Sequence, residues 1–316
     1  MRSYTLSASA KINLYLEIIG DRPDGYHELA MVMQSIGLAD SVTVRSLDTH
    51  RIDIVCTHPH VPLNASNLAY KAADLMQQTF PDAAKQNGGV EIEIQKHIPI
   101  GAGLAGGSAN AAAVLVGIDL LWGLGLTQAE LQTMGATLGS DIPFCIVGGT
   151  AIATGRGERI APLPNLDECH VILAKYNSMS VSTPWAYQAY RSAFSESYVS
   201  DKDGVGDRHH QFHSGPIVSA ITRHDIAQVG KLLHNDLEKV VLPKHPPVEA
   251  LRTALLGQNP IGAMMSGSGP TVFAIAETKS HAEEISATIR TEFPDPDLEL
   301  WVTPIVPSGI QLVDKS

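Results

Sequence analysis

The sequence predicts an α+β fold with two domains that share a cleft. The chain has 316 residues, of which 44% are apolar, so it is long for one compact core and sufficient for two. Segments typical of strands and of helices intermix without strict β-α-β alternation, which favours α+β over a doubly wound sheet. The third observation is a glycine-rich turn, GAGLAGGS, which joins a strand-like segment to a helix-like one.

The charge of the chain limits its partners. There are 22 basic and 33 acidic side chains, which leave a formal charge of −11. Because affinity for nucleic acid comes mainly from Lys and Arg at the phosphates, this balance argues against a nucleic-acid partner. A small anionic ligand remains possible, since backbone N–H groups attract phosphate even inside an acidic protein.

Cysteine spacing and hydropathy predict a soluble, cytoplasmic protein. The three cysteines show no zinc-like spacing, which favours a reducing compartment. The first residues lack the uninterrupted apolar core of a signal peptide. The most apolar segment, 111–126, contains Asp119 and is shorter than a membrane span, so we expect no membrane partner.

The first half of the chain predicts strands followed by helices. Alternation over 11–18 predicts a strand with Lys11, Asn13 and Tyr15 on one face. Pro-Asp-Gly at 23–25 predicts a turn, and Asn67 is placed to cap a helix over 67–80. Thr127, three residues before Glu130, indicates a capping box. Further strands are expected at 41–47, 51–56 and 90–98, and a further helix at 108–121.

The second half of the chain also predicts both helices and strands, with a polar segment between them. Thr183 followed by Pro184 predicts a capped helix start. The segment 195–215 is polar and without period, so we expect a mobile loop or linker. Its histidines, together with His58 and His60, lack the companion ligands of a zinc site, and a solvated loop is the favoured interpretation. The remaining expectations are strands at 170–176, on both sides of 266–270 and at 298–306, and helices at 216–239, 248–257 and 281–292.

The glycines at 101, 103 and 106 spell G-x-G-x-x-G, a dinucleotide fingerprint. A dinucleotide fold also needs a second strand that ends in an acidic residue, and the segment after the helix predicts turn and helix instead. Phosphate binding fits better, because the N–H groups of residues 106–109 would be free at the helix start and aided by its dipole. No G-K-[ST] follows, so the loop supplies no lysine of its own, whereas the Ser108 hydroxyl could reach a phosphate or a magnesium ion.

Two charged residues fit phosphoryl-transfer chemistry, which needs a cation near the moving phosphate and a group that orients the acceptor. Lys11 shares a face with Asn13 in an otherwise apolar strand; the alternative is a solvated lysine on an edge strand. Asp141, in LGSDIPF, is either a carboxylate placed at a helix start for chemistry or a plain capping residue. The segment alone leaves both interpretations of Asp141 open.

Taken together, these motifs resemble the GHMP small-molecule kinases. The motifs are SAKINL at 9–14, PIGAGLAGGS at 99–108 and SGSGP at 266–270. PDGYHEL, LGSDIPF, GGTAIATGRGE and VSTPWAY resemble the branch that acts on a CDP-linked substrate. The resemblance implies a two-domain GHMP kinase fold with the active site between an ATP-binding domain, 1–160, and a second domain, 161–316. It further implies transfer of phosphate from ATP, with Mg²⁺, to the 2-hydroxyl of a methylerythritol unit in the non-mevalonate isoprenoid route.

The resemblance also implies roles for individual residues. Asp141 would accept the hydroxyl proton, although the ordinary pKa of an aspartate is only about 3.9, and Lys11 would hold the carboxylate and the acceptor. Tyr26 and His27 would grip cytosine, and Asn13, Tyr176 and Thr183 would also contact the substrate. The ATP loop would comprise Pro99, Ile100, Gly101, Ala102, Gly103, Leu104, Ala105, Gly106, Gly107, Ser108 and Ala109. A second phosphate-proximal loop would comprise Gly267, Ser268 and Gly269.

Some alternatives stay open at this stage. Ala109 stands where many GHMP kinases have a second serine, which excludes a hydroxyl contact from that position. Apart from the possible role of Ser108, no residue is assigned to magnesium. A GHMP kinase with another acceptor, such as homoserine or mevalonate, or a non-catalytic GHMP-like binding protein remains an alternative function.

Overall fold

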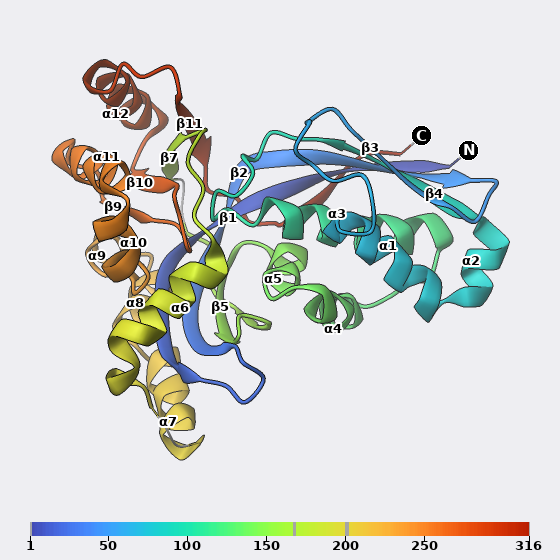
Figure 1. Ribbon diagram of the computed structural model, residues 1–316, viewed down its shortest axis with the longest axis horizontal. Coiled ribbons are helices and arrows are strands. Elements are labelled where there is room, and N and C mark those ends of the chain that lie inside the picture. Colours follow the sequence, from blue (N-terminus) through green and yellow to red (C-terminus); the bar gives the residue numbers. More distant parts are fainter. Residues whose placement is uncertain (1, 167–168, 200–201, 316) are drawn as a thin grey trace.

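The computed structural model describes residues 2–166, 169–199 and 202–315. Within these ranges the strands form one sheet of eight strands and one of four. Figure 1 shows most of the larger sheet in one half of the molecule, with α1, α3 and α4 along one face, and the smaller sheet in the other half beside α11 and α12; the β1–β2 hairpin extends from the first half into the second. The α+β prediction is confirmed.

The larger sheet is built on two long antiparallel strands, β1 (Ser3–Asp21) and β2 (His27–Leu47), joined by the predicted turn. Its main order is β12-β1-β2-β4-β3. The other members are β3 (Ile52–Cys56), β4 (Gly89–Gln95), β5 (Thr150–Gly155), β6 (Arg159–Pro162), β8 (His234–Asn235) and β12 (Ile310–Lys315). The sequence did not predict β12, the strand that returns to pair with β1.

A shift of register in β1 decides which side chains share a face. Asn13 lies opposite Met33 and Tyr15 opposite Val32, so Leu14 has no partner of its own on β2. Such a bulge interrupts the alternation of faces. Leu14 lies in the core under the helices, whereas Leu16 lies in the core of the other half of the molecule. The prediction that Tyr15 shares a face with Lys11 and Asn13 was therefore wrong.

Helices pack closely against the larger sheet. They are α1 (Leu68–Thr79), α2 (Pro81–Asn87), α3 (Gly106–Trp122), α4 (Gln128–Leu138) and α5 (Ile142–Val147). Two predicted caps are confirmed: the Asn67 side chain accepts from the Ala69 N–H at 2.9 Å, and Thr127 and Glu130 form a capping box. The small residues of α3 allow a close approach, since a Cβ on Gly117 would lie 2.8 Å from Val44.

The smaller sheet has the order β11-β7-β10-β9. Its strands are β7 (His170–Tyr176), β9 (Gly262–Met265), β10 (Val272–Ala276) and β11 (Leu298–Pro304), and its nearby helices are α6 (Thr183–Phe194), α11 (Pro246–Gly257) and α12 (Lys279–Glu292). The cap of α6 is Ser182 rather than Thr183, because the Ser182 hydroxyl accepts from the Trp185 N–H. This frees the Thr183 side chain for another contact.

Two predictions between these elements were wrong. The segment 195–215 is not simply a loop: it contains the short turn η1 (Ser195–Ser197) and the helix α7 (Lys202–His213), which Arg208 ties to Glu17 of β1. The predicted long helix over 216–239 is instead broken into pieces. These are α8 (Pro216–Thr222), α9 (Ile226–Lys231), β8 and α10 (Glu238–Val241), followed by η2 (Leu242–Lys244). His224, with a φ of 56°, marks the first break.

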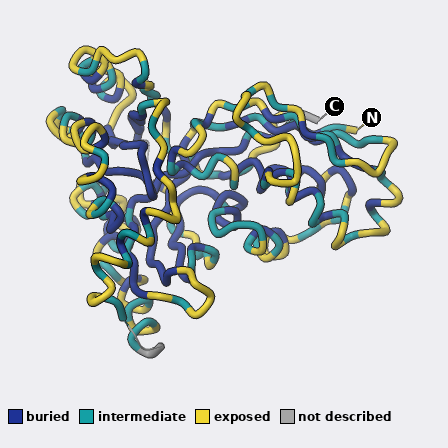
Figure 2. Tube along the Cα trace, viewed as in Figure 1, coloured by how far each residue is buried: buried dark blue, intermediate teal, exposed yellow. Residues whose placement is uncertain are grey.

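Buried residues run through both sheets and across their junction (Figure 2). The proposed division of the chain near residue 160 stays a prediction, and it has to accommodate two later segments, β8 and β12, that pair with β1. Among the helices in the described ranges, none is long and apolar enough to cross a bilayer.

Asp236 fastens the segment around β8 to β1. Its carboxylate accepts from the Ile18 N–H at 2.8 Å, from His234 Nε2 at 3.1 Å and from Lys239 Nζ at 2.7 Å. Burial alone would raise the pKa of this carboxyl, but these hydrogen bonds outweigh it and hold the pKa at about 2. The ionised carboxylate is therefore part of the folded structure.

We expect Asp236 to contribute stability that acid removes. Because its pKa is lowered by folding, the contribution is present above about pH 4 and is lost as the pH falls toward 2. The replacement Asp236→Asn should lower the free energy of unfolding at pH 7 by about 2 kcal/mol. Urea denaturation of both proteins at pH 7 and pH 3 measures the gap, which should shrink at pH 3. An equal gap at both pH values would contradict this, and Asp74→Asn on α1 is the control.

Candidate active site

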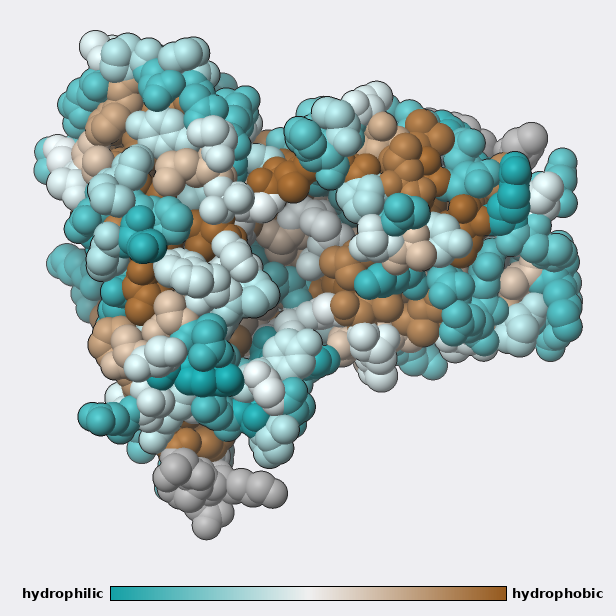
Figure 3. Space-filling model, in the orientation of Figure 1, coloured by the Kyte–Doolittle hydropathy of each residue, from teal (hydrophilic) through white to brown (hydrophobic). Residues whose placement is uncertain are grey.

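A cavity of about 770 Å³ lies where the two halves of the molecule meet. Its walls come from β1, the β1–β2 turn, the glycine loop, the segment before α5, the start of α6 and the loop after β9. Figure 3 shows the surface hollowed between the two halves. A concave site at such a junction is the usual place for a small-molecule ligand.

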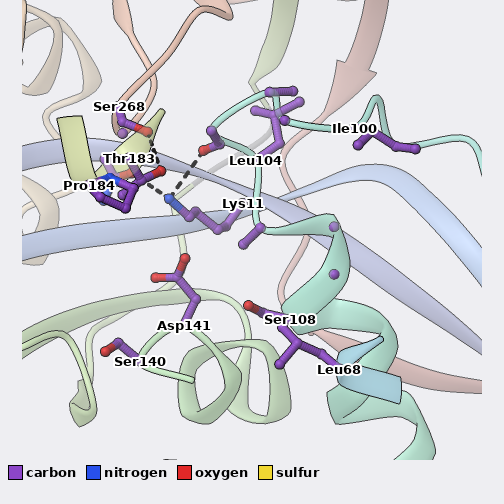
Figure 4. Close-up of a pocket in the computed structure, with 18 of the residues that line it drawn as sticks. Lys11, Leu68, Ile100, Leu104, Ser108, Ser140, Asp141, Thr183, Pro184 and Ser268 are labelled. Carbon is purple, nitrogen blue, oxygen red and sulfur yellow. Dashed lines mark hydrogen bonds between the residues drawn. The ribbon is translucent and has the colours of Figure 1, made fainter. Parts of the chain in front are cut away.

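The glycine loop presents backbone donors to this cavity. The N–H groups of residues 106–108 lie at the start of α3. Within the described chain they donate to no backbone carbonyl. The prediction that the Ala109 N–H is also free was wrong, because it donates to the Ala105 carbonyl at 2.9 Å. In Figure 4 the Ser108 hydroxyl lies at the start of α3, on the same side of the cavity as Asp141. Three free N–H groups at a helix start attract an anion.

Gly103 joins this loop to the loop after β9. Its φ is 75°, and a Cβ at this position would lie 2.3 Å from the Ser266 carbonyl oxygen. Its own carbonyl accepts from the Ser266 hydroxyl at 3.1 Å and from Lys11 Nζ at 3.2 Å. Only glycine permits this approach.

Lys11 is a buried cation aimed into the cavity. It is 5% exposed and donates to Asn13 Oδ1 at 2.7 Å. It forms no ion pair with any carboxylate in the described chain. The alternative of a solvated lysine on an edge strand is wrong, since β1 lies between β12 and β2. A buried ammonium without a counter-charge favours an anion beside it.

Asp141 lies at the start of α5 but does not cap it. Its side chain makes no capping hydrogen bond, and Figure 4 shows the carboxylate turned toward the cavity and Lys11. The plain capping role is therefore not the one that the structure supports. Both charged groups influence the buried Cys145 thiol below them, whose pKa is raised chiefly by burial and then by Asp141.

The opposite end of the cavity is aromatic. Tyr26 is 52% exposed, and the buried His27 ring lies 5.1 Å from the ring of Tyr187 on α6. Burial, and then the charge of Arg191, lower the pKa of His27, so the imidazole is neutral at pH 7. Its Nε2 lies 3.5 Å from Asp21 Oδ1 and makes no hydrogen bond in the described structure. Sequence reasoning missed Tyr187, although it follows Thr183 at helical i+4 spacing.

The other predicted residues are divided between the cavity and its surroundings. Thr183 lines the cavity and its hydroxyl lies 2.8 Å from that of Ser268, which lines it with Gly267. Ala109 and Gly269 are not among the described residues that line it. Tyr176, at the end of β7, is not among the described residues that line the cavity.

Lys96 is a functional candidate that sequence reasoning missed. It follows β4, is buried in an ion pair with Asp40, and lies 3.0 Å from where a Cβ on Gly106 would be. Asp40 also accepts from the N–H groups of His97 and Ile98, at 2.7 and 2.9 Å. The sequence offered one signal for this role, namely that Lys96 lies just before the glycine loop. The loop thus has a lysine beside it, supplied by the preceding strand.

No metal cluster is evident in the described chain, where no three His, Cys, Asp or Glu side chains gather in a way that could hold an ion. The histidines of 209–213 lie on α7, and His209 Nε2 is 3.5 Å from Glu28. The expected loop was wrong for them, because they lie on a helix, but His210 and His213 are exposed to solvent as expected.

Comparison with known proteins gives matches over the whole chain. Residues 67–149 match the GHMP kinases N terminal domain, and residues 217–295 match the GHMP kinases C terminal region. A protein of Nostoc punctiforme named 4-diphosphocytidyl-2-C-methyl-D-erythritol kinase is 58% identical over 316 residues, which is 100% of both chains. A crystal structure of 4-(cytidine 5'-diphospho)-2C-methyl-D-erythritol kinase has a TM-score of 0.72 at 30% identity, covering 95% of this chain and 98% of that one. The crystal structure of a homoserine kinase from Cytophaga hutchinsonii shares the fold, with a TM-score of 0.76 at 18% identity. The match covers 98% of this chain and 97% of that one.

The close approach at Gly103 predicts a difference between two glycines. Gly101 and Gly103 both have positive φ, so alanine costs about 1 kcal/mol of backbone strain at either position. Only at Gly103 does the added carbon collide with backbone, since the nearest atom at Gly101 is 3.8 Å away. Gly103→Ala should lower the free energy of unfolding by about 3 kcal/mol and Gly101→Ala by about 1 kcal/mol. Urea denaturation measures both, and equal losses would contradict the collision.

Proposed function

The chain belongs to the 4-diphosphocytidyl-2-C-methyl-D-erythritol kinase family of the GHMP kinases, and on this premise we propose how its cavity performs the reaction. The protein is a kinase, a phosphotransferase that uses ATP and a small-molecule acceptor. In the proposal, the γ-phosphoryl group of ATP passes to the 2-hydroxyl of CDP-linked methylerythritol, in the non-mevalonate isoprenoid route. The observation that carries the proposal is that Lys11, Asp141 and the glycine loop line one cavity with Tyr26 and His27.

ATP binds with its phosphates against the glycine loop. The free N–H groups at the start of α3 and its positive dipole end face the anion. Lys96 adds a positive charge beside Gly106, although Asp40 partly neutralises it. The loop of Gly267 and Ser268 closes the same region from the other half of the molecule, through its contact with Gly103. Backbone donors therefore position the donor substrate.

The acceptor hydroxyl lies between Asp141 and Lys11. As its oxygen bonds to the γ-phosphorus, the bond from that phosphorus to the bridging oxygen breaks and ADP leaves. The hydroxyl proton passes to the Asp141 carboxylate. Because the hydroxyl acidifies late in a loose transition state, the weak basicity of an aspartate suffices when the geometry is right. The Lys11 ammonium, fixed by Asn13 and Gly103, balances the negative charge on the moving phosphoryl group.

Mg²⁺ fits the donor set of this region. Ser108 and Asp141 direct oxygen atoms into the same part of the cavity (Figure 4), and hydroxyl and carboxylate oxygens are ligands that Mg²⁺ accepts together with phosphates and water. Ser108 is the side chain that would hold the ion. When bound, Mg²⁺ neutralises charge on the β- and γ-phosphates.

The cytosine of the acceptor occupies the aromatic end. Tyr26 offers an exposed ring face for stacking, and Tyr187 adds a second ring beside His27. The neutral His27 imidazole has an unpartnered Nε2 that can hydrogen-bond with the edge of the base. A buried polar group left without its partner is costly, so an acceptor without cytosine binds poorly.

A coupled assay of ADP release tests the proposed substrate. Turnover with CDP-linked methylerythritol should exceed turnover with homoserine or mevalonate by at least about 10³-fold, because only the first fills the aromatic end. Comparable or faster turnover of either other acceptor would overturn the proposed substrate. Binding of ATP with no turnover of any of the three would instead support a binding protein.

Replacement of Asp141 tests the proposed base. Asp141→Asn keeps the shape of the side chain but cannot take the proton, so kcat should fall by about 10²–10⁴-fold. The dissociation constant for ATP should change by less than two-fold. Asp74→Asn, on α1 outside the cavity, serves as the matched control. Near-normal turnover of Asp141→Asn would refute the assignment.

His27 and Tyr176 form a pair that tests the cytosine site. His27→Ala should raise KM for the CDP-linked acceptor about ten-fold, the loss of one buried hydrogen bond, while KM for ATP stays the same. Tyr176→Phe should change neither constant, since Tyr176 lies outside the cavity lining. If Tyr176→Phe raises the KM of the acceptor, Tyr176 contacts the substrate after all; equal effects of His27→Ala on both substrates would argue against the cytosine role.

A further inference from the structure

Among the described residues, the cavity contains one cation that has neither an ion-pair partner nor a role in the chemistry above. Lys11, Lys96, Arg156 and Arg191 all line it. Lys96 is paired with Asp40, and Arg191 is paired with Asp21 at 2.8 Å. Lys11 belongs to the reacting end. Arg156 forms no ion pair in the described chain, and Asp24, whose pKa it helps to lower, is paired with Arg22 at 3.1 Å.

The guanidinium of Arg156 is held in place without being neutralised. One of its nitrogens donates to the Ala136 carbonyl near the end of α4, at 2.8 Å. The backbone N–H of the same residue donates to Glu158 at 2.7 Å, which fixes the turn between β5 and β6. A guanidinium has five N–H donors, and this structure uses one of them. The remaining donors are available to a ligand.

Arg156 lies between the two ends of the cavity. Its guanidinium carbon is 5.0 Å from the centre of the Tyr26 ring, at the aromatic end. Its neighbour Gly157 packs on the residue before the catalytic Asp141, because a Cβ on Gly157 would lie 3.7 Å from Ser140 Cβ. Any acceptor that reaches from Tyr26 to Asp141 passes this guanidinium.

We infer that Arg156 binds the diphosphate of the acceptor and selects for acceptors that carry one; this inference rests on the proposed function. In a CDP-linked alcohol the diphosphate lies between the base and the hydroxyl, which is where Arg156 lies in the cavity. A guanidinium suits this task because it can donate two parallel hydrogen bonds to phosphate while it stacks on an aromatic ring. Homoserine and mevalonate carry no diphosphate and gain nothing from Arg156.

The experiment compares ligands that differ only in their phosphates. Dissociation constants of cytidine and CDP are measured by calorimetry for the wild-type protein and for Arg156→Gln, Arg156→Lys and Arg159→Gln. Arg159 is the matched control, since its side chain is 68% exposed and lies outside the cavity lining. Arg156→Gln should weaken CDP at least about ten-fold and cytidine less than two-fold, with KM for ATP unchanged. Arg156→Lys keeps the charge but not the paired donors, so it should recover only part of the loss, and Arg159→Gln should have no effect.

Each other outcome has a distinct meaning. Equal weakening of CDP and cytidine would overturn the inference in favour of a role in supporting Tyr26. Weakening of ATP alone would place Arg156 on the donor side, and no change in any ligand would remove it from binding; both overturn the inference while the proposed function stands. If the wild-type protein bound neither CDP nor cytidine, the proposed function itself would fail.

Discussion

The Gly103 carbonyl is the point on which the rest of the site depends. It accepts from Lys11 Nζ and from the Ser266 hydroxyl, so one atom links the strand with the buried ammonium, the glycine loop and the loop from the smaller sheet. The contact requires positive φ and no side chain at residue 103. Further back, the Asn235 amide donates to the carbonyls of Met265 and Gly267, both at 2.8 Å. Because Asn235 is itself paired with β1, the three segments hold one another at a constant spacing.

The cavity is lined with positive groups although the chain as a whole is negatively charged. The chain carries a formal charge of −11, yet two anionic substrates have to enter one cavity. Its walls carry Lys11 and Arg156 without counter-charges, and the free N–H groups at the start of α3 add their dipole. Low solvent access strengthens these interactions relative to those at the surface. The cavity is therefore attractive to phosphate in spite of the net charge of the protein.

Local patterns predicted much of the site, and long-range pairing accounts for the rest. The caps Asn67 and Thr127, the strand–loop–helix around the glycines and the segment of Asp141 all depend on neighbouring residues, and they were predictable. The bulge at Leu14 arises from the register with β2, which no local alternation records. Likewise, α7 is mostly polar and is held by partners far away in the sequence, since Arg208 pairs with Glu17 and the Phe212 ring lies 5.1 Å from the Tyr15 ring. Lys96 and Arg156 line the cavity only because distant elements bring them there.

The two sides of the cavity are held by interactions of different strength. On the donor side, Lys96, Asp40 and Asn110 form a buried network, and removing one partner from such a network is strongly destabilising. On the acceptor side, the β1–β2 hairpin is tied to α6 by Arg191 and Asp21 and to α7 by Arg208 and Glu17; three of these side chains are 30–47% exposed, and Glu17 is 16% exposed. Ion pairs of this kind contribute about 0.2–1 kcal/mol each and are screened by salt. The donor side therefore rests on a buried network of charged and polar side chains, whereas the acceptor side rests on more exposed ion pairs that salt weakens.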